Sequence, residues 1–488
     1  MKGDDLVAAV LREPDDVAVR LVYADWLEER GDPRGEFIRV QCELARLDAA
    51  RPVILSALHS CSWGMSEALE DAVDVPRRGE LEAREQALLE EHEDDWAEGL
   101  DDLGVSEWKF RRGFVECVTL PAEDYLEHAA ALARVAPIRD VEVEEIDGYC
   151  AALAALPELG RLRSLALKGT QREAAEGIQP LAASPHLAGL KHLEICHHYF
   201  GDKGATALAS SRHLAGLGTL YLDDCEVGAA GAGALAASRR LQGLTGLGLF
   251  SCEIGERGAV ALAASRLLGQ LTSLDLTACE LGDEGTRALA ASIGGKGLGV
   301  LVLGHNGIGP EGARSLATSP HLSNLMALDL SQNRIGSAGL AALAASASLG
   351  RVRALGLTDT RVGNPGVRAL AASATLPNLR VLDLCSNPRV DCAGVQALAA
   401  SPNLRGLTRL GLGQTGAGDG AARALAASPQ MSGLRRLHLY DTNVGDAGAE
   451  ALLGSPHLGR LDELDLWSRR LSEGVQRKID QRFGAGEG

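Results

Sequence analysis

Aromatic residues are scarce in this chain of 488 residues, since Phe, Trp and Tyr together make up only 3% of it. Apolar residues still reach 46% and Gly occurs 58 times, so the core must be built from small side chains at close spacing. This composition argues against a large enzyme core of Phe, Tyr and Trp. It also argues against disorder, which requires low hydrophobicity and a high density of charge.

Long apolar runs and paired cysteines are lacking as well. No stretch of 18 apolar residues occurs, and the segment that follows Met1-Lys2-Gly3-Asp4-Asp5 is interrupted by Arg12. We therefore expect neither a membrane span nor a secretory signal, and we predict a cytoplasmic location. The ten Cys residues are scattered without a C-x-x-C pair, which fits a reducing compartment.

Positive charge is in short supply in the first third of the chain. Residues 1–150 contain 16 basic and 37 acidic residues, whereas the remainder contains 32 and 29, for a net charge of −18. The chain therefore has no sequence-wide excess of Lys and Arg to bind phosphate groups, which disfavours a nucleic-acid partner. The acidic part keeps an Ala-rich protein soluble, or it steers a basic partner.

Internal repetition is what the sequence has in abundance. An L-x-x-L-x-L pattern returns at steps of 27 or 28 residues, and a small polar residue follows eight positions after each start, except at His198 and Arg469. An Ile-Gly or Val-Gly pair and a G-x-x-A-L-A-A-S segment come next, as from Gly231 to Ser238. The pattern starts at Leu162, Leu190, Leu217, Leu244, Leu271, Leu298, Leu325, Val352, Leu379, Leu407, Leu434 and Leu461.

Each repeat predicts one strand, one inward turn and one helix. Leu-x-Leu alternation places two side chains on one face of a short strand, and one strand per coil gives a parallel sheet. The Ala-rich segment predicts a helix that ends near Ser-Pro, as at Ser184-Pro185. The small polar residue satisfies backbone groups inside the turn and forms a structural ladder. The ladder residues that we single out are Cys225, Cys252, Cys279, Asn306, Asn333 and Asn387.

These repeats resemble the leucine-rich repeat, in the long-repeat class of ribonuclease inhibitor and with segments like those of GALA-type repeats. The resemblance implies an α/β fold, a right-handed solenoid with a concave parallel sheet and convex helices. We predict twelve repeats over 161–470, a linking strand, helix and degenerate first repeat over 113–160, and a capping helix and tail over 471–488. The degenerate first repeat is predicted from Ile138, Val141 and Val143, which echo the strand pattern. The capping helix is predicted from Val475, Ile479 and Phe483, which are spaced four residues apart.

Residues 1–112 predict a separate, small and acidic helical domain, with helices near 4–12, 16–30, 34–48 and 78–97. The run from Arg20 to Arg39 resembles the repeat-companion domain that accompanies bacterial leucine-rich repeats, and the segment 112–121 resembles its link into the repeats. Residues 49–77 fit this resemblance poorly and are predicted as an insertion. The resemblance implies an architecture and no activity. Helix packing and capping explain Tyr23, Asp25, Trp26 and Asp32 more simply than a recognition surface does.

Motifs for catalysis and cofactor binding are weak. The G-x-G-x-x-G match from Gly411 to Gly416 lies in a repeat strand and does not open a helix, unlike a dinucleotide-binding loop. His192, His197 and His198 lie close together, but no Cys or carboxylate accompanies them at a familiar metal-ligand spacing. We therefore predict no catalytic residue, no metal and no cofactor.

Binding residues are expected at the strand positions between and just after the repeat leucines. In the middle coils these positions carry small residues such as Val300, Ala327 and Ala354, and Asp275, Asp329 and Asp383 form an acidic line that we read as solvated. Aromatic and Arg residues gather towards the two ends, as in interaction hot spots. The predicted binding residues are Tyr221, Asp223, Phe250, Asp275, Arg409, Arg436, His438, Tyr440, Asp465 and Trp467.

The sequence thus predicts a noncatalytic protein-interaction module or scaffold whose partner is an unknown protein, with the oligomeric state open. Two alternatives follow from the resemblance, an inhibitor that covers a partner enzyme and an accessory protein that regulates a GTPase. An enzyme housed in residues 1–112 is the least favoured interpretation. For Trp467, the competing explanation is packing against the capping helix.

Overall fold

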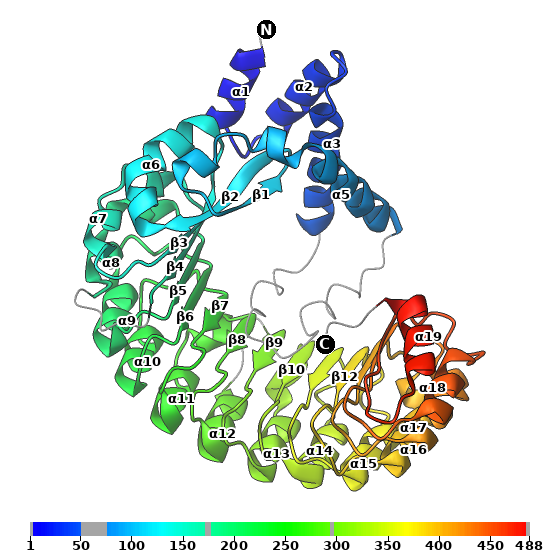
Figure 1. The fold of residues 1–488 in the computed structure, drawn as a ribbon. Coiled ribbons are helices and arrows are strands. Elements are labelled where there is room, and N and C mark those ends of the chain that lie inside the picture. Colours follow the sequence, from blue (N-terminus) through cyan, green and yellow to red (C-terminus); the bar gives the residue numbers. More distant parts are fainter. Residues whose placement is uncertain (1–2, 50–75, 171–176, 293–296, 485–488) are drawn as a thin grey trace. The chain divides into compact units, whose positions relative to one another are not determined.

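The computed structural model describes residues 3–49, 76–170, 177–292 and 297–484. They divide into two compact units. Unit 1 contains the helical N-terminal residues together with the first coils, and unit 2 contains the later coils. In the coils of each unit, the strands lie on the inner side and the helices on the outer side (Figure 1). The predicted α/β class, a parallel sheet with flanking helices, is confirmed. Unit 1 comprises residues 3–49, 76–170, 177–227 and 238–244, and unit 2 comprises 228–237, 245–292 and 297–484.

Unit 1 begins with helices close to the predicted ranges: α1 (Gly3–Arg12), α2 (Val17–Glu28), α3 (Arg34–Ala49) and α5 (Pro76–Trp96). The segment predicted as mainly helical also contains a strand, because β1 (Glu107–Arg111) pairs antiparallel with β2 (Phe114–Pro121). From β2 onward the strands pair in parallel, in chain order. They are β3 (Asp140–Glu144), β4 (Ser164–Lys168), β5 (His192–Cys196) and β6 (Thr219–Asp223), with helices α6 (Ala122–Val135), α7 (Cys150–Ala154), α8 (Gln179–Ala183) and α9 (Gly201–Ser210).

Unit 2 continues the pattern with strands of three residues and one helix per coil. Its strands are β7 (Gly246–Gly248), β8 (Ser273–Asp275), β9 (Val300–Val302), β10 (Ala327–Asp329), β11 (Ala354–Gly356), β12 (Val381–Asp383), β13 (Arg409–Gly411), β14 (Arg436–His438) and β15 (Glu463–Asp465). Its helices are α10 (Ala229–Ala236), α11 (Gly255–Ala263), α12 (Gly282–Ser292), α13 (Pro310–Thr318), α14 (Gly336–Ala344), α15 (Asn364–Ala372), α16 (Cys392–Ala399), α17 (Asp419–Ala426), α18 (Asp446–Leu453) and α19 (Glu473–Phe483).

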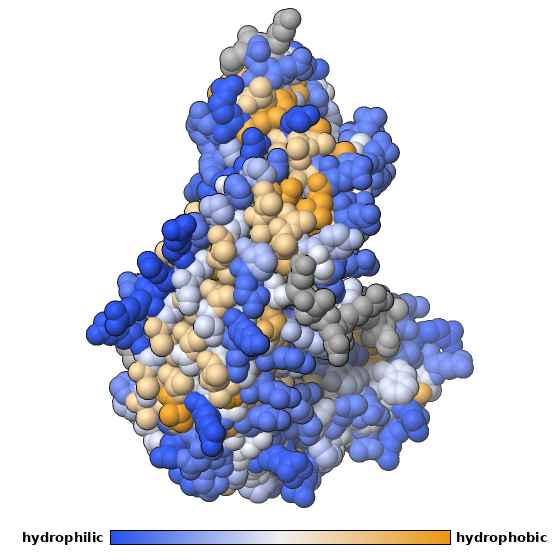
Figure 2. Space-filling model, turned by 90° about the vertical axis from the view of Figure 1, so that its left-hand side faces the viewer, coloured by the Kyte–Doolittle hydropathy of each residue, from blue (hydrophilic) through white to orange (hydrophobic). Residues whose placement is uncertain are grey.

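The repeat leucines form the core because the strands stand in direct register. Leu301, Leu328 and Leu355 are Cα partners on neighbouring strands, and each is at most 2% exposed. Small Ala faces let the outer helices lie close together, which explains how a core with so few aromatic residues packs. Figure 2 shows weakly hydrophobic residues mixed with hydrophilic ones over the side of the molecule that lies at the left in Figure 1. In α19, Val475 and Ile479 are buried, in keeping with a capping helix.

The ladder side chains are buried and connect each coil to the preceding one. Asn333 accepts hydrogen bonds at Oδ1 from the backbone N–H groups of Asn306 (3.0 Å) and Ile308 (2.9 Å). Its Nδ2 donates to three carbonyl oxygens, that of Leu303 in the preceding coil and those of Leu330 and Ser331 in its own. The thiol of Cys279 donates a hydrogen bond to the Leu249 carbonyl oxygen in the preceding coil. All six predicted ladder residues are at most 3% exposed: Cys225, Cys252, Cys279, Asn306, Asn333 and Asn387.

The residue that precedes the ladder position adopts a left-handed backbone conformation in coil after coil. His305 has φ of 52° and Gln332 has φ of 57°, although neither is Gly. This conformation turns the chain inward after the strand, and it costs non-Gly residues about 1–2 kcal/mol each. The ladder hydrogen bonds that follow hold the turn in place.

A second column of hydrogen bonds lies at the other end of the helices. The hydroxyl of Ser319 donates to the carbonyl oxygen of Ala290 (2.6 Å), and the same bond joins Ser346 to Ala317. The Ser319 oxygen also accepts from the His321 N–H, so that it begins the short 3-10 turn after the helix. The A-A-S segment therefore links successive coils as well as ending each helix. Equivalent serines are Ser184, Ser211, Ser373, Ser401, Ser428 and Ser455.

Candidate functional site

The predicted binding residues nearest the N-terminal side differ in exposure. Tyr221 and Asp223 lie on β6 in unit 1 and are half-buried, and Phe250, just after β7 in unit 2, is also half-buried. Asp275 on β8 is only 3% exposed. The expectation that all of these positions are exposed is therefore wrong for Asp275.

The small residues of the middle coils are also buried rather than exposed. Val300, Val302, Ala327, Ala354 and Val381 form one apolar cluster at 0–1% exposure, with Met326 packed against it. Ala327 is the direct register partner of both Val300 and Ala354, so these side chains pack on one another along the inner face of β9 to β12. This stretch of the inner face is part of the core of unit 2.

The acidic line is buried too, which corrects the expectation that it is solvated. Asp275, Asp329 and Asp383 are 2–3% exposed. Each accepts a hydrogen bond from the backbone N–H two residues later, at 2.8–2.9 Å. Asp275 also accepts from the hydroxyl of Thr277 at 2.7 Å. These carboxylates order the end of each strand, and burial raises the pKa of Asp275 to about 6.

We expect Asp275→Asn to stabilise unit 2 at neutral pH. The pKa of the Asp275 carboxyl is 3.8 in the unfolded chain and about 6 in the folded chain, so the folded chain binds this proton more tightly. The free energy of unfolding of the wild type therefore falls as the pH rises from about 4 to about 6. Asn keeps the acceptor for Thr277 and removes the charge, so the gain reaches up to about 3 kcal/mol at pH 7–8 and vanishes below pH 4. Urea unfolding at pH 4, 5, 6 and 7 measures it. Asp359→Asn, at an exposed carboxylate of unit 2, is the control, and a gain independent of pH contradicts the prediction.

Aromatic and charged side chains, one of them exposed and the others half-buried, gather at the C-terminal end of unit 2. Trp467, which follows β15, is 55% exposed. The N–H of Asp441 donates to the Trp467 carbonyl oxygen (2.8 Å), which places Tyr440 on the neighbouring coil beside it. Arg436 forms an ion pair with Glu463 (Nε to Oε2, 3.1 Å). We name Arg436, Tyr440, Glu463, Asp465 and Trp467 the terminal patch.

His438 supports the terminal patch from a buried position. It is 6% exposed, with Nε2 2.8 Å from Glu463 Oε1 and Nδ1 3.5 Å from Asp465 Oδ2. Burial lowers the pKa of His438 although Glu463 and Asp465 favour its charged form. Arg409 is 1% exposed. His438 and Arg409 were expected at the surface, and their burial corrects both expectations.

The G-x-G-x-x-G match has a structural explanation. Gly411 ends β13, and Gly413 follows it beneath the ring of Tyr440, where a Cβ atom would overlap the ring. The glycine at 413 therefore makes room for the aromatic side chain of the terminal patch.

His198 replaces the ladder residue in unit 1 and forms a buried row with two other groups. Its Nδ1 lies 3.3 Å from Asp147 Oδ1, and its Nε2 lies 3.4 Å from the Cys150 sulfur. Nucleophile, base and carboxylate stand in this order in cysteine hydrolases. Cys150 and His198 are both 0% exposed, however, so a substrate has no access to the thiol. We interpret the row as a variant of the ladder.

A cluster of metal-ligand types escaped the sequence analysis. Glu194 and Cys196 on β5 and Asp223 on β6 bring a thiol and two carboxylates within 4.8 Å of one another. Burial and the nearby carboxylates raise the pKa of the Cys196 thiol. The signal lay in the repeat register, because Cys196 and Asp223 both stand six residues after a repeat start. Of the histidines considered earlier, His192 instead contacts Thr219 Oγ1 (2.9 Å), and His197 contacts Asp224 Oδ2 (3.0 Å).

In the helical module, the aromatic residues of α2 take part in packing. Tyr23 is buried and stacks on Trp26, with ring centroids 6.1 Å apart. The Asp32 carboxylate accepts from the N–H of Arg34 at the start of α3 (2.9 Å), as a capping residue does. Asp25 forms an exposed ion pair with Arg39. These contacts agree with packing and capping roles.

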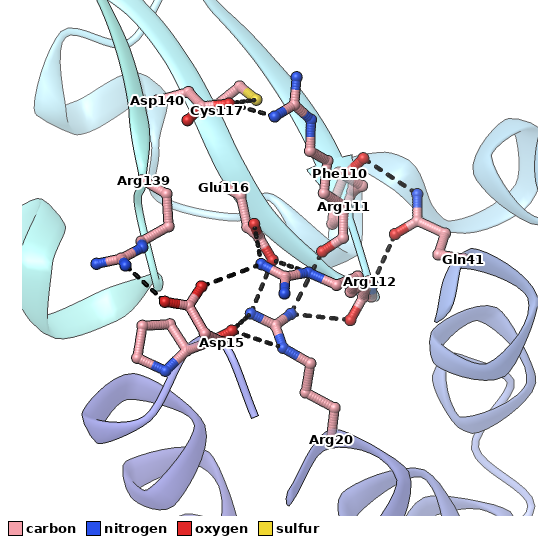
Figure 3. A network of polar contacts seen from close by, with 12 residues as sticks. Asp15, Arg20, Gln41, Phe110, Arg111, Arg112, Glu116, Cys117, Arg139 and Asp140 are labelled. Carbon is pink, nitrogen blue, oxygen red and sulfur yellow. Dashed lines mark hydrogen bonds and ion pairs between the residues drawn. The ribbon is translucent and has the colours of Figure 1, made fainter. Parts of the chain in front are cut away.

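A buried ion-pair network joins this module to the sheet of unit 1. The Arg20 side chain is fully buried, and its Nη2 lies 2.7 Å from Glu116 Oε1 on β2. Arg112 also binds Glu116 with two hydrogen bonds, and Asp15 bridges Arg112 and Arg139 (Figure 3). Arg20 thus connects the two segments that carry the resemblance to the repeat-companion domain. Burial lowers the pKa of Arg20.

A cavity of about 510 Å³ lies beside this network in unit 1. Five arginines line it, and each is paired with a carboxylate, which leaves the cavity without a strong excess of positive charge. The pairs are Arg78 with Glu82, Arg111 with Asp140, Arg112 with Glu116, and Arg139 and Arg163 with Asp15. We assign these arginines to the fold.

Comparison with known proteins identifies the repeats. The family model described as leucine-rich repeat matches residues 271–290, 298–317, 321–344 and 432–453. An internalin (inlF) from Listeria monocytogenes str. 4b F2365 is similar at 16% identity and a TM-score of 0.42, over 72% of this chain and 87% of that one. The yeast Rad7 and Elc1 complex gives 13% identity and a TM-score of 0.47, over 85% and 96%. A search of the curated proteins found no match. Among the described residues, no helix has the length and apolar character needed to cross a membrane.

Proposed function

We propose that this chain of leucine-rich repeats is a noncatalytic protein-interaction module that binds a partner protein through the terminal patch of unit 2. The observation that carries the proposal is Trp467, a large aromatic side chain left 55% exposed at the end of an ordered sheet. Its exposure argues against packing beneath the capping helix α19. A partner would gain by burying it, because exposed aromatic side chains dominate binding energy at protein interfaces.

The surroundings of Trp467 fit such a role. Arg436 and Glu463 supply paired charges at the rim, and the buried His438 holds the carboxylates of Glu463 and Asp465. Side chains fixed in this way lose little conformational freedom on binding, which reduces the cost of association. The partner is therefore expected to present an apolar side chain flanked by polar groups.

The sequence also suggested two other functions, an inhibitor of a partner enzyme and a regulator of a GTPase. An inhibitor would cover the active site of its partner, and a GTPase regulator would change the hydrolysis rate of its partner. Both actions require the same first step of protein binding. Activity assays on a captured partner would distinguish them from a scaffold.

Substitution of the terminal patch tests the proposal. We expect the triple variant Arg436→Ala, Tyr440→Ala, Trp467→Ala to bind a partner captured by the wild-type chain at least about 30-fold more weakly, because hot-spot residues each cost about 2 kcal/mol or more when truncated. Quantitative capture from native lysate with mass spectrometry, followed by titration of the purified partner, measures the loss.

A matched control is Val260→Ala. Val260 is 47% exposed on helix α11 of the same unit, and this variant should retain full binding. Equal circular dichroism and thermal unfolding of both variants would exclude misfolding as the cause. A partner that binds the triple variant as tightly as the wild type would overturn the assignment of the terminal patch.

A further inference from the structure

The inner face of β5 and β6 in unit 1 brings three metal-ligating groups together. Cys196 and Asp223 are direct register partners on these parallel strands. Glu194 lies two residues before Cys196, on the same face, and its Oε1 is 3.3 Å from the Cys196 sulfur. One oxygen of each carboxylate and the sulfur all lie within 4.8 Å of one another. The three groups therefore converge on one point.

The charges around this point favour a cation. Lys168 on β4 is the register partner of Cys196, but its ammonium group pairs with Glu142 and also lies near Glu144 on β3. Glu194 and Asp223 thus place two carboxylates beside Cys196. Like charges this close together on neighbouring strands repel each other, and a divalent ion between them reverses that effect.

We infer that Glu194, Cys196 and Asp223 form a binding site for a divalent transition-metal ion of the zinc class. A thiolate ligand selects such ions over Ca²⁺ and Mg²⁺, which prefer oxygen ligands alone. Zinc bonds of about 2.0–2.3 Å hold ligand atoms about 3.5 Å apart, so ligand atoms that already lie within 4.8 Å of one another need to approach by no more than about 1 Å. On binding, the sulfur–hydrogen bond of Cys196 breaks, the sulfur bonds the metal, and the proton passes to solvent.

Such a site would leave one coordination position of the metal open. Three protein ligands leave the fourth corner of a tetrahedron for water or for a side chain of another molecule. The site lies on the inner face of the sheet, where Glu194 and Asp223 are half-buried. It is independent of the terminal patch, which belongs to unit 2.

Titration with Co²⁺ alone tests the inference on the full, chelator-treated chain. We expect one equivalent of Co²⁺ to produce the near-ultraviolet charge-transfer band of a cobalt–thiolate bond, and Zn²⁺ to displace it. Cys196→Ser should abolish the band. Glu194→Gln and Asp223→Asn should each weaken binding more than about 100-fold, beyond the loss caused by removing a group that only supports a ligand.

The controls are two other inner-face thiols, Cys117→Ser in unit 1 and Cys385→Ser in unit 2, which should leave the band unchanged. Circular dichroism of each variant checks its fold. The inference is overturned if no band forms, if the band survives Cys196→Ser, or if both carboxylate variants bind Co²⁺ like the wild type.

Discussion

Replacing Arg20 with Ala is expected to lower the free energy of unfolding by about 3–5 kcal/mol, the range for removing one partner of a buried ion pair. Arg20 is fully buried, and its guanidinium binds Glu116 and also the carbonyl oxygens of Pro14 and Arg112. Ala leaves these acceptors unsatisfied between helix α2 and strand β2. Urea unfolding followed by tryptophan fluorescence measures the loss.

The matched control for Arg20 is Arg84→Ala. Arg84 on α5 makes an ion pair with Glu36 on α3 at 2.6 Å, but both side chains are nearly half exposed. An exposed pair contributes about 0–1 kcal/mol because water screens it. Equal losses for the two variants would contradict a structural role for the buried network. Arg20→Lys should recover little of the loss, because an ammonium group cannot span the acceptors on both sides.

The second large effect is expected for Asn333→Ala, which should lower the free energy of unfolding by at least about 3 kcal/mol. The substitution leaves the backbone N–H groups of Asn306 and Ile308 buried without their acceptor, at about 1–3 kcal/mol each. Three carbonyl oxygens lose their donor as well. Hydrogen exchange of the Asn306 and Ile308 amides should speed up along with the fall in stability.

Asn364→Ala provides the comparison at a half-buried asparagine whose side-chain hydrogen bonds are exposed. Its side chain joins neighbouring coils through Asp391, in a position open to solvent. Water can replace these bonds, so the expected cost is below about 1 kcal/mol. If Asn333→Ala and Asn364→Ala were equally destabilising, the ladder would not be the element that holds successive coils together.

Much of the architecture could be predicted because it repeats. The Leu-x-Leu spacing predicts the strands, and the Ala-rich segments predict the helices. The left-handed residues could not be found in the same way. His305 and Gln332 carry no glycine signal, so only the backbone reveals their conformation.

The candidate sites were harder to predict, since a strand pattern does not say which side chains a neighbour will cover. Asp275 and Arg409 occupy positions that alternation assigns to the exposed face, yet both are buried. Trp467 was found because its neighbouring leucines already fill the core. The contact between Cys196 and Asp223 depends on aligning coils that are 27 residues apart, which a search for local metal motifs does not do.

The two columns of hydrogen bonds also govern how such a chain can change in length. The ladder amide of Asn333 and the hydroxyl of Ser319 each reach an acceptor in the preceding coil. When a whole coil is lost or duplicated, the ladder and serine side chains of the next coil still find the same backbone acceptors in the coil before them. Insertion or loss of part of a coil would instead place a helix where a strand is required. Gene duplication and deletion can therefore lengthen or shorten the sheet only in whole coils. Between such events, evolution can alter those inner-face residues that are not buried while both columns remain intact.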